Sequence, residues 1–274
     1  MRTYPEYSVV FPAYNEEDRL EPTIRETVAY FRTKQAPAEI IVVDDGSRDA
    51  TSALVQRLSA EFEEIRLIRL ARNRGKGHAV RSGVVNAEGR YVLFADADGS
   101  TPIAEIERLE SALHGGAAIA IGSREIGGDG TRVRTRWYRR VIGRAFHALV
   151  TTLTVRGILD TQCGFKLLRS DVAQELFSRM RMEGFSFDVE LLMMAQRRGH
   201  PIAEVPVNWT HRPGSRVSLV ADSARMARDL FVIRAHALRG HYDAPHLAPL
   251  APLARPPVSA RSVADEAVHA SVLS

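Results

Sequence analysis

Short apolar runs and longer helical patterns alternate along the first half of the chain. Runs rich in Val, Ile and Leu predict strands, whereas apolar positions three and four residues apart predict helices between them. The expected strands are 7–11, 39–43, 66–70, 91–95 and 117–121, and the expected helices are 19–33, 49–61, 78–87 and 103–113. This alternation predicts an α/β fold whose mostly parallel, Rossmann-like sheet has helices on both faces. Ligands of such sheets bind at the carboxyl ends of the strands, so we expect the chemistry in the loops that follow them.

Two arginine-rich segments in the second half of the chain have apolar positions at helical spacing. They cover residues 137–153 and 221–239. Basic amphipathic helices lie on membrane surfaces, although an apolar stripe packed against a protein core gives the same pattern. Beyond the second segment the chain is rich in Pro and Ala. We therefore expect one folded domain over residues 1–240 that ends in an amphipathic helix, and a disordered Pro/Ala-rich tail over residues 241–274.

The composition permits a sizeable core, because 45% of the 274 residues are hydrophobic. The single cysteine, Cys163, excludes an intramolecular disulfide and favours a reducing environment. Residues Met1 to Glu6 have neither the basic start nor the apolar centre of a signal peptide, and no apolar stretch approaches the ~18 residues of a membrane span. We therefore expect a cytoplasmic protein that contacts a membrane peripherally, on its cytoplasmic face.

The net charge of +4 conceals a local excess of arginine. Six arginines fall between Arg132 and Arg144, and such a cluster attracts phosphates, nucleic acid or acidic lipid. A nucleic-acid-binding module would use this basic segment, but it would leave the acidic residues at the strand ends without a role. We therefore do not expect nucleic acid among the partners.

Two carboxylates follow the predicted strand 91–95. Side chains two residues apart on an extended chain lie on the same side, so Asp96 and Asp98 can face one point. Two carboxylates without a nearby His or Cys suit a hard divalent cation such as Mg²⁺ or Mn²⁺, which takes its other ligands from water and substrate phosphates. A polar turn that ends the strand is the alternative. The metal interpretation predicts a nucleotide diphosphate as the partner.

Polar residues also follow the first two predicted strands. After the first strand, Tyr14 can stack on a base and Asn15 or Glu16 can bond a nucleotide, or these residues cap the following helix. After the second strand, Asp44 and Asp45 can accept hydrogen bonds from a ribose hydroxyl and from a base N–H. Both loops therefore offer contacts to a nucleoside.

The loop after the third strand, 72–78, is basic and rich in glycine. Its glycines let the backbone approach a phosphate, the following helix start offers free N–H groups, and Lys76 adds a positive charge. It is not a Walker P-loop, because Leu70 and Gly77 stand where that motif needs a glycine and a hydroxyl. The four loops together offer base, ribose, diphosphate and metal contacts, which predicts a site for a nucleoside diphosphate.

The motifs of these loops resemble those of a known enzyme family. FPAYNE, VDDGS, RNRGKGHA and DADGS, in this order, resemble the family 2 glycosyltransferases with a GT-A fold, and TQCGFKL, FDVELL and PIAEVPVNW are similar to dolichyl-phosphate β-glucosyltransferases. The resemblance implies an inverting transfer of glucose from UDP-glucose to a polyprenyl phosphate of the dolichyl type. It also implies metal binding by Asp96 and Asp98, diphosphate contact by Lys76, and nucleoside contacts by Pro12, Ala13, Tyr14, Glu16 and Asp45.

A phosphate acceptor would require cations, because two anions must approach each other. Arginine suits phosphate oxygens, and the candidates are Arg124, Arg139, Arg212 and Arg216. Asp188 lies among apolar residues and can orient the acceptor or the sugar, act as a base, or simply stabilise a helix N-terminus. The alternative functions are a polyprenyl-phosphate mannose synthase that uses GDP-mannose and a family 2 transferase with a hydroxyl acceptor.

Overall fold

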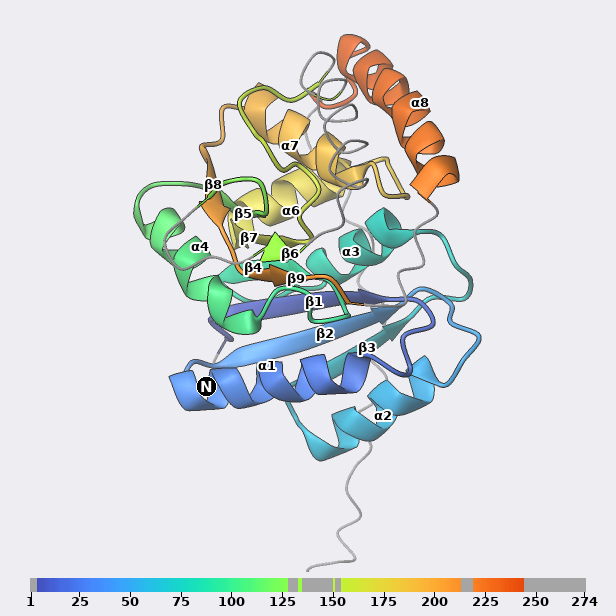
Figure 1. The fold of residues 1–274 in the computed structure, drawn as a ribbon, viewed down its shortest axis with the longest axis vertical. Coiled ribbons are helices and arrows are strands. Elements are labelled where there is room, and N and C mark those ends of the chain that lie inside the picture. The colour runs from blue at the N-terminus through green and yellow to red at the C-terminus, as the bar shows by residue number, and fades with distance from the viewer. Residues whose placement is uncertain (1–3, 128–132, 135–149, 151–153, 213–218, 244–274) are drawn as a thin grey trace, which may run out of the picture.

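The computed structural model describes residues 4–127, 133–134, 150, 154–212 and 219–243. Within them, a seven-stranded sheet forms the centre of the molecule (Figure 1). Its strands are β1 (Tyr7–Ala13), β2 (Ala38–Asp44), β3 (Ile65–Arg69), β4 (Tyr91–Ala95), β5 (Ile119–Ser123), β7 (Phe165–Arg169) and β8 (Ile202–Pro206), and a separate pair is made by β6 (Val133–Arg134) and β9 (Trp209–Thr210).

The large sheet is parallel except at one strand. Its order is β3-β2-β1-β4-β7-β5-β8, and β7 runs antiparallel to both of its neighbours. The other pairs in this sheet are parallel, which confirms the prediction of a mostly parallel sheet. β7 itself was not predicted, and its insertion between β4 and β5 brings its sequence next to the end of β4.

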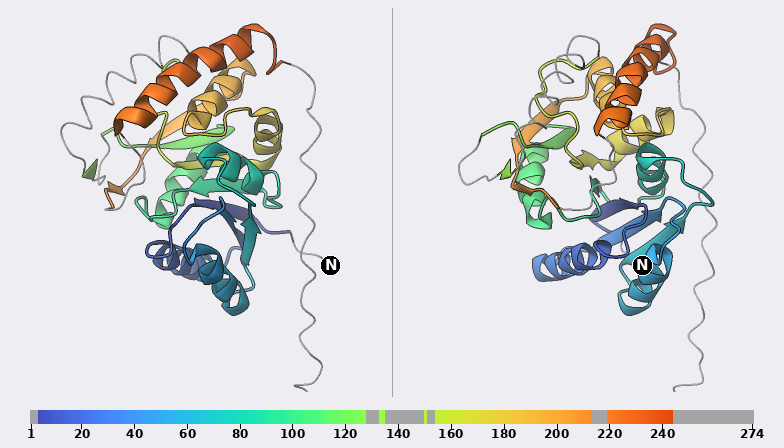
Figure 2. Two further views of the ribbon diagram at one scale, coloured as in Figure 1. Left: turned by 90° about the vertical axis from the view of Figure 1, so that its right-hand side faces the viewer. Right: turned by 45° about the vertical axis from the view of Figure 1, so that its right-hand side comes forward.

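Helices cover both faces of the sheet, as predicted (Figures 1 and 2). Side chains alternate along each strand, so Val9 and Val10 of β1 enter two separate apolar clusters, one on each face. The cluster around Val9 includes residues of α1 (Leu20–Lys34), α2 (Thr51–Glu61) and α4 (Ile106–His114), which follows the short 3₁₀ turn η1 (Ile103–Glu105). The cluster around Val10 includes residues of α3 (Lys76–Val84), α6 (Ser170–Arg179), α7 (Phe187–Arg197) and α8 (Leu219–Leu238).

Two predicted boundaries differ from the structure in ways that matter for the site. β1 continues to Ala13, so Pro12 and Ala13 belong to a strand rather than to a loop. Pro12 has no N–H to donate, and it is tolerated because the pairing of β1 with β4 ends at Val10. Tyr242 is fully buried, so the folded part extends beyond residue 240.

The two amphipathic segments have different outcomes. The second forms α8, which lies on the outside of α7 (Figure 2). The first, predicted over 137–153, lies outside the described residues except for residue 150, and so does the predicted tail beyond residue 243. Among the described helices, none combines the length and apolarity that a transmembrane span requires.

Candidate active site

A cavity of about 650 Å³ lies at the carboxyl ends of β1, β2 and β4. The loops whose motifs predicted nucleotide contacts meet around it, together with the chain before α7 and part of α8. Of the residues predicted to bind the nucleotide or a cation, its walls contain Pro12, Ala13, Tyr14, Glu16, Asp45, Lys76, Asp96 and Asp98.

Asp44 is absent from these walls. Its side chain is fully buried, and its carboxylate accepts hydrogen bonds from the backbone N–H of Ser47 at 2.8 Å and from the hydroxyl of Ser52. Asp44 therefore fixes the turn after β2 and the start of α2, and the structure does not support the predicted nucleotide contact for it. The reason is geometric, because adjacent residues of a strand point to opposite sides and only Asp45 points to the cavity.

Asp45 ties the second loop to the third. Its two carboxylate oxygens accept hydrogen bonds from the backbone N–H groups of Arg74 at 2.9 Å and Gly75 at 2.7 Å. Burial raises the pKa of Asp45, although these two bonds oppose the shift. Gly75 has a φ of 112°, and a Cβ there would lie 2.5 Å from the carbonyl oxygen of Glu183, so this position requires glycine.

Asn15 joins the first loop to the second. Its side-chain oxygen accepts a hydrogen bond from the N–H of Arg48 at 2.8 Å, and its own N–H donates to the hydroxyl of Ser47 at 2.9 Å. Glu16, in contrast, lines the cavity and holds Arg19 through two hydrogen bonds of 2.8 and 2.6 Å. Of the two residues proposed to bond a nucleotide, only Glu16 is therefore at the cavity wall.

Lys76 begins α3 and lies against the first of the two predicted metal ligands. Its Nζ is 2.6 Å from Oδ1 of Asp96. Burial alone would lower the pKa of Lys76, but the negative charges of Asp96 and Asp188 outweigh it and raise the pKa. Lys76 therefore carries its positive charge at the cavity wall, beside the Asp96 carboxylate.

Asp98 also has a positively charged side chain beside it. Its Oδ2 lies 3.8 Å from Arg19, and its Oδ1 accepts the N–H of Ser100 at 3.0 Å. The side chains of Asp96 and Asp98 are 36% and 22% exposed, so both carboxylates can be reached from the cavity. No group of three His, Cys, Asp or Glu side chains arranged to hold a metal occurs in the part of the chain that the structure describes. Two carboxylates with room beside them fit Mg²⁺ or Mn²⁺ that takes further ligands from phosphates and water.

Asp188, predicted to be catalytic, is buried behind the cavity rather than in its wall. Its Oδ1 lies 2.5 Å from Nζ of Lys166, and that Nζ also donates to the carbonyl of Cys163 at 2.7 Å. Burial raises the pKa of Asp188, although the charge of Lys166 opposes this shift. The buried acid thus has a buried cationic partner, as the cost of burying an isolated charge requires.

Of the four arginines predicted to bind the acceptor phosphate, the structure describes two, Arg124 and Arg212. Arg124 makes a two-pronged pair with Asp160, at 2.7 and 2.8 Å, and its guanidinium lies 5.5 Å from the ring centroid of Trp209. Arg212 is exposed. Arg139 and Arg216 lie outside the described residues. Arg124 is thus the predicted acceptor arginine whose position is both described and fixed by other side chains.

The far wall of the cavity comes from residues that the sequence motifs did not indicate. Gly184 and Phe185 precede α7, and Arg225, Met226 and Asp229 belong to α8. The hydroxyl of Ser186 donates to Asp229 at 3.0 Å, which links these two elements. This part of α8 has arginines and apolar residues at helical spacing, a pattern that predicts a membrane surface and gives no sign of a cavity wall.

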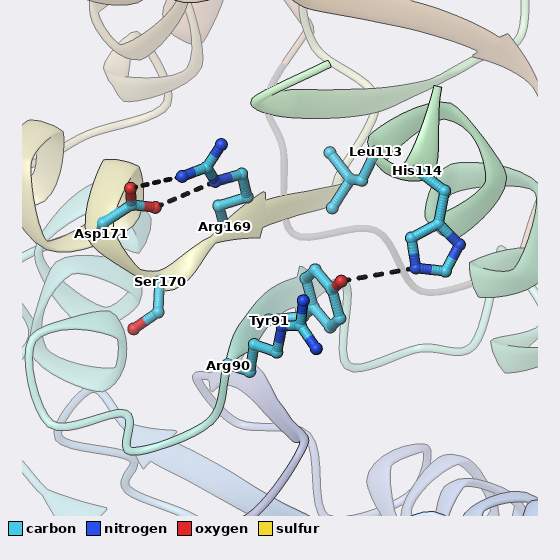
Figure 3. A pocket seen from close by; sticks show the side chains of 7 residues that line it. All are labelled: Arg90, Tyr91, Leu113, His114, Arg169, Ser170 and Asp171. Carbon is cyan, nitrogen blue, oxygen red and sulfur yellow. Dashed lines mark hydrogen bonds and ion pairs between the residues drawn. The ribbon is translucent and has the colours of Figure 1, made fainter. Parts of the chain in front are cut away.

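A second cavity of about 540 Å³ lies at the other end of the strands, where β4 begins (Figure 3). Arg169 pairs there with Asp171 at 2.8 Å, and the Tyr91 hydroxyl lies 3.4 Å from the His114 ring (Figure 3). This cavity contains none of the strand-end motifs and only one carboxylate. The first cavity is therefore the candidate active site.

Residues 8–177 match the family described as glycosyl transferase family 2. The chain is 42% identical to dolichyl-phosphate beta-glucosyltransferase of Homo sapiens over 246 residues, which cover 85% of this chain and 76% of that protein. It is 43% identical to the protein of the same name from Drosophila melanogaster over 242 residues, covering 83% of this chain and 74% of the relative.

Solved structures show the same fold at lower identity. Glucosyl-3-phosphoglycerate synthase from Mycobacterium tuberculosis in complex with Mg²⁺ and UDP matches with a TM-score of 0.62 at 20% identity, covering 88% of this chain and 80% of that chain. Its complex with Mn²⁺, UDP and phosphoglyceric acid matches with a TM-score of 0.59 at 21% identity, with the same coverage.

The mostly parallel sheet matches the GT-A fold of the solved neighbours, and the family match and the curated relatives identify the chain as a glycosyltransferase. The chain belongs to glycosyl transferase family 2, and the curated relatives named above are dolichyl-phosphate beta-glucosyltransferases.

Proposed function

We propose that this enzyme transfers glucose from UDP-glucose to a polyprenyl phosphate of the dolichyl type, with inversion at the anomeric carbon and with Mg²⁺ or Mn²⁺ bound. The observation that carries the proposal is the cavity in which the loops after β1, β2, β3 and β4 meet. The names of the relatives support glucose and the lipid phosphate, and the ligands of the two fold neighbours support UDP and the cation.

The donor lies against residues that already surround the cavity. The nucleoside contacts Pro12, Ala13, Tyr14, Glu16 and Asp45, and Lys76 contacts the diphosphate. Asp96 and Asp98 hold the cation, which when bound neutralises the diphosphate and stabilises the departing UDP. In the structure, Lys76 and Arg19 lie beside these carboxylates. Both side chains therefore supply positive charge close to the donor phosphates.

The reaction needs no strong base. An oxygen of the acceptor phosphate forms the bond to the anomeric carbon, and the bond from that carbon to the β-phosphate oxygen breaks, so UDP leaves with the electron pair. A phosphate monoester has a second pKa of about 6 and is mostly a dianion near pH 7, so no proton has to be removed from the nucleophile. The repulsion between acceptor and donor phosphates is reduced by arginine, and Arg124 is the candidate that Asp160 and Trp209 hold in place.

We also propose that the enzyme works at the cytoplasmic face of a membrane, to which it binds peripherally through α8. Phe231 and Leu238 on this helix are 58% and 77% exposed, and the exposed Arg228 stands in the same stretch of α8 as the cavity-lining Arg225, Met226 and Asp229. Exposed apolar residues beside arginines suit the boundary between headgroups and acyl chains of anionic lipid.

A donor and acceptor screen tests the proposal. The protein is incubated with dolichyl phosphate and either UDP-glucose or GDP-mannose, with Mg²⁺, with Mn²⁺ or with EDTA. We expect lipid-linked glucose from UDP-glucose, with its formation lost in EDTA. Transfer from GDP-mannose alone, or transfer of glucose to soluble hydroxyl acceptors but not to the lipid phosphate, overturns the proposal.

A further inference from the structure

Because Gly164 has no side chain, the Asp96 carboxylate can occupy the space beside its Cα. β4 and β7 pair antiparallel with Ala95 opposite Phe165, and the N–H of Asp96 donates to the carbonyl of Gly164 at 3.0 Å. A Cβ on Gly164 would lie 2.3 Å from Oδ2 of Asp96 and 2.4 Å from its Cγ and Oδ1. The backbone of Gly164 is not left-handed, so an alanine is compatible with the backbone, and its methyl group would displace the Asp96 carboxylate.

The backbone beside Gly164 is held by a buried ion pair. The carbonyl of Cys163 accepts a hydrogen bond from Nζ of Lys166 at 2.7 Å, and this Nζ lies 2.5 Å from Asp188. The side chains of Lys166 and Asp188 are 0% and 4% exposed. Because a buried ammonium without partners is costly, the pair fixes the Cys163 carbonyl to the start of α7.

The thiol of Cys163 takes no part in this arrangement. Burial raises its pKa to about 12, so it stays protonated at neutral pH. Cys163 contributes through its backbone carbonyl, which a Ser or Ala substitution would preserve.

We propose that Gly164, fixed through Cys163 by the Lys166–Asp188 pair, sets the orientation of the Asp96 carboxylate for its cation, and that Asp188 is a positioning residue. A methyl group at position 164 forces Asp96 to rotate, away from the place where it meets Lys76 at 2.6 Å. The role toward the cation rests on the proposed function, whereas the packing of Gly164 against Asp96 does not.

A double-mutant cycle tests the packing and the cation separately. The variants are Gly164→Ala, Asp96→Ala and the two combined, and the measurements are the thermal unfolding midpoint without metal and Mn²⁺ binding in the presence of UDP, followed by electron paramagnetic resonance. Gly164→Ala is expected to lower the midpoint, because the displaced Asp96 carboxylate loses its ion pair with Lys76, and to weaken Mn²⁺ binding by about tenfold. In the Asp96→Ala background, the same substitution should leave the midpoint unchanged, because the clashing atoms are gone.

Gly115→Ala is the matched control, since Gly115 follows α4 and its Cβ would have no contact shorter than 3.3 Å. It should leave Mn²⁺ binding unchanged. An equal drop of the midpoint in both backgrounds, or unchanged Mn²⁺ binding in Gly164→Ala, overturns the inference. If even the wild-type protein binds no Mn²⁺ with UDP, the proposed cation fails, while the thermal cycle still decides whether Gly164 makes room for Asp96.

Asp188→Asn distinguishes a positioning residue from a base. A positioning role predicts weaker Mn²⁺ binding and a pH–rate profile of unchanged shape. Loss of one limb of the profile with Mn²⁺ binding intact would identify Asp188 as a base and overturn this part of the inference.

Discussion

At the strand ends, the spacing of two acids decides whether both reach the cavity. Asp44 and Asp45 are adjacent, so their side chains point to opposite sides, and only Asp45 lines the cavity. Asp96 and Asp98 are two residues apart, and both line it. Asp96 and Asp98 follow the end of β4 in a turn, in which the N–H of Gly99 donates to the carbonyl of Asp96 and Ala97 lines the cavity as well, so both carboxylates reach the cavity. The two acids differ in their neighbours, since Lys76 meets Asp96 and Arg19 lies near Asp98.

Replacing Asp98 by alanine is expected to lower kcat by about 100- to 1,000-fold, the usual cost of removing a group that stabilises charge in the transition state. Asp98→Asn can keep the bond to the N–H of Ser100 and loses only the charge, so it should be nearly as defective. Initial rates of lipid-linked glucose formation across a Mn²⁺ titration measure both variants.

The control for Asp98 is Asp171→Ala, because Asp171 is an acid that pairs with Arg169 at the second cavity. It should retain wild-type rates. Full activity of both Asp98 variants with a cation still required would show that the cation is held elsewhere.

Much of the site could be predicted from sequence because it is local. Each motif follows a buried strand, and the alternation of side chains indicates which residue faces the ligand. The ion pairs could not be predicted in this way, because Lys166 meets Asp188 across 22 positions and Arg124 meets Asp160 across 36. Such partners depend on the order of strands in the sheet, which no local pattern encodes.

Among the helices, α7 uses Glu190 to join the two parts of the chain that flank the far wall of the cavity. Its buried carboxylate accepts hydrogen bonds from the N–H groups of Arg181 at 3.0 Å and Met182 at 2.8 Å, and from the hydroxyl of Tyr242 at 2.8 Å. Arg181 and Met182 precede Gly184, which lines the cavity, and Tyr242 follows α8. One side chain therefore fixes both the approach to α7 and the end of α8.

Glu190→Gln is expected to gain stability relative to wild type as the pH rises. Burial raises the pKa of Glu190 from its ordinary 4.5, more than its hydrogen bonds lower it. The folded state therefore favours the protonated form, and the contribution of Glu190, complete below pH 4.5, is lost as the pH rises through the folded-state pKa. Glutamine does not titrate. Urea unfolding at pH 4 and pH 8 should show the difference in unfolding free energy moving in favour of the variant.

Glu175→Gln is the control, because the pKa of Glu175 is shifted in the opposite direction from that of Glu190. Burial alone would raise the pKa of Glu175, but the hydrogen bond and charge of Arg198 lower it overall. Its stabilisation is present above the unfolded pKa and lost as the pH falls, so this variant should lose stability relative to wild type between pH 4 and pH 8. A shift in the same direction for both variants would contradict the assignment for Glu190.

The strands and helices also differ in how well the pattern of apolar residues in the sequence predicts them. The parallel strands β1, β2 and β4 each contain an uninterrupted run of at least four apolar residues, so the sequence indicates them directly. β7 was missed because Lys166 interrupts its five residues, and only the partner in α7 makes a buried lysine acceptable there. The start of α3 at Lys76 was also missed, since the glycines beside this residue weaken the helical pattern.

Helix α8 connects the candidate active site with the outer surface of the protein. Its inner side packs on the core through Leu230 and Ile233, and Arg225, Met226 and Asp229 line the cavity. Its outer side exposes Phe231 and Leu238, and the helix lies at the end of the molecule away from α1 and α2 (Figure 1). A lipid surface that met this outer side would bring a lipid phosphate close to the cavity proposed to hold the donor.

The last prediction is that lipid binding depends on this outer side. Burial of a Phe or Leu side chain is worth about 1.5–3 kcal/mol, and an arginine near an anionic surface about 1 kcal/mol. Phe231→Ser should therefore weaken binding to phosphatidylserine vesicles at least about tenfold and Arg228→Gln about fivefold, and only the second loss should shrink at high salt. Flotation of the full chain measures both. Tyr4→Ser, which removes an aromatic residue 71% exposed near the N-terminus, is the matched control; if it weakens binding as much as Phe231→Ser does, α8 is not the lipid-binding element.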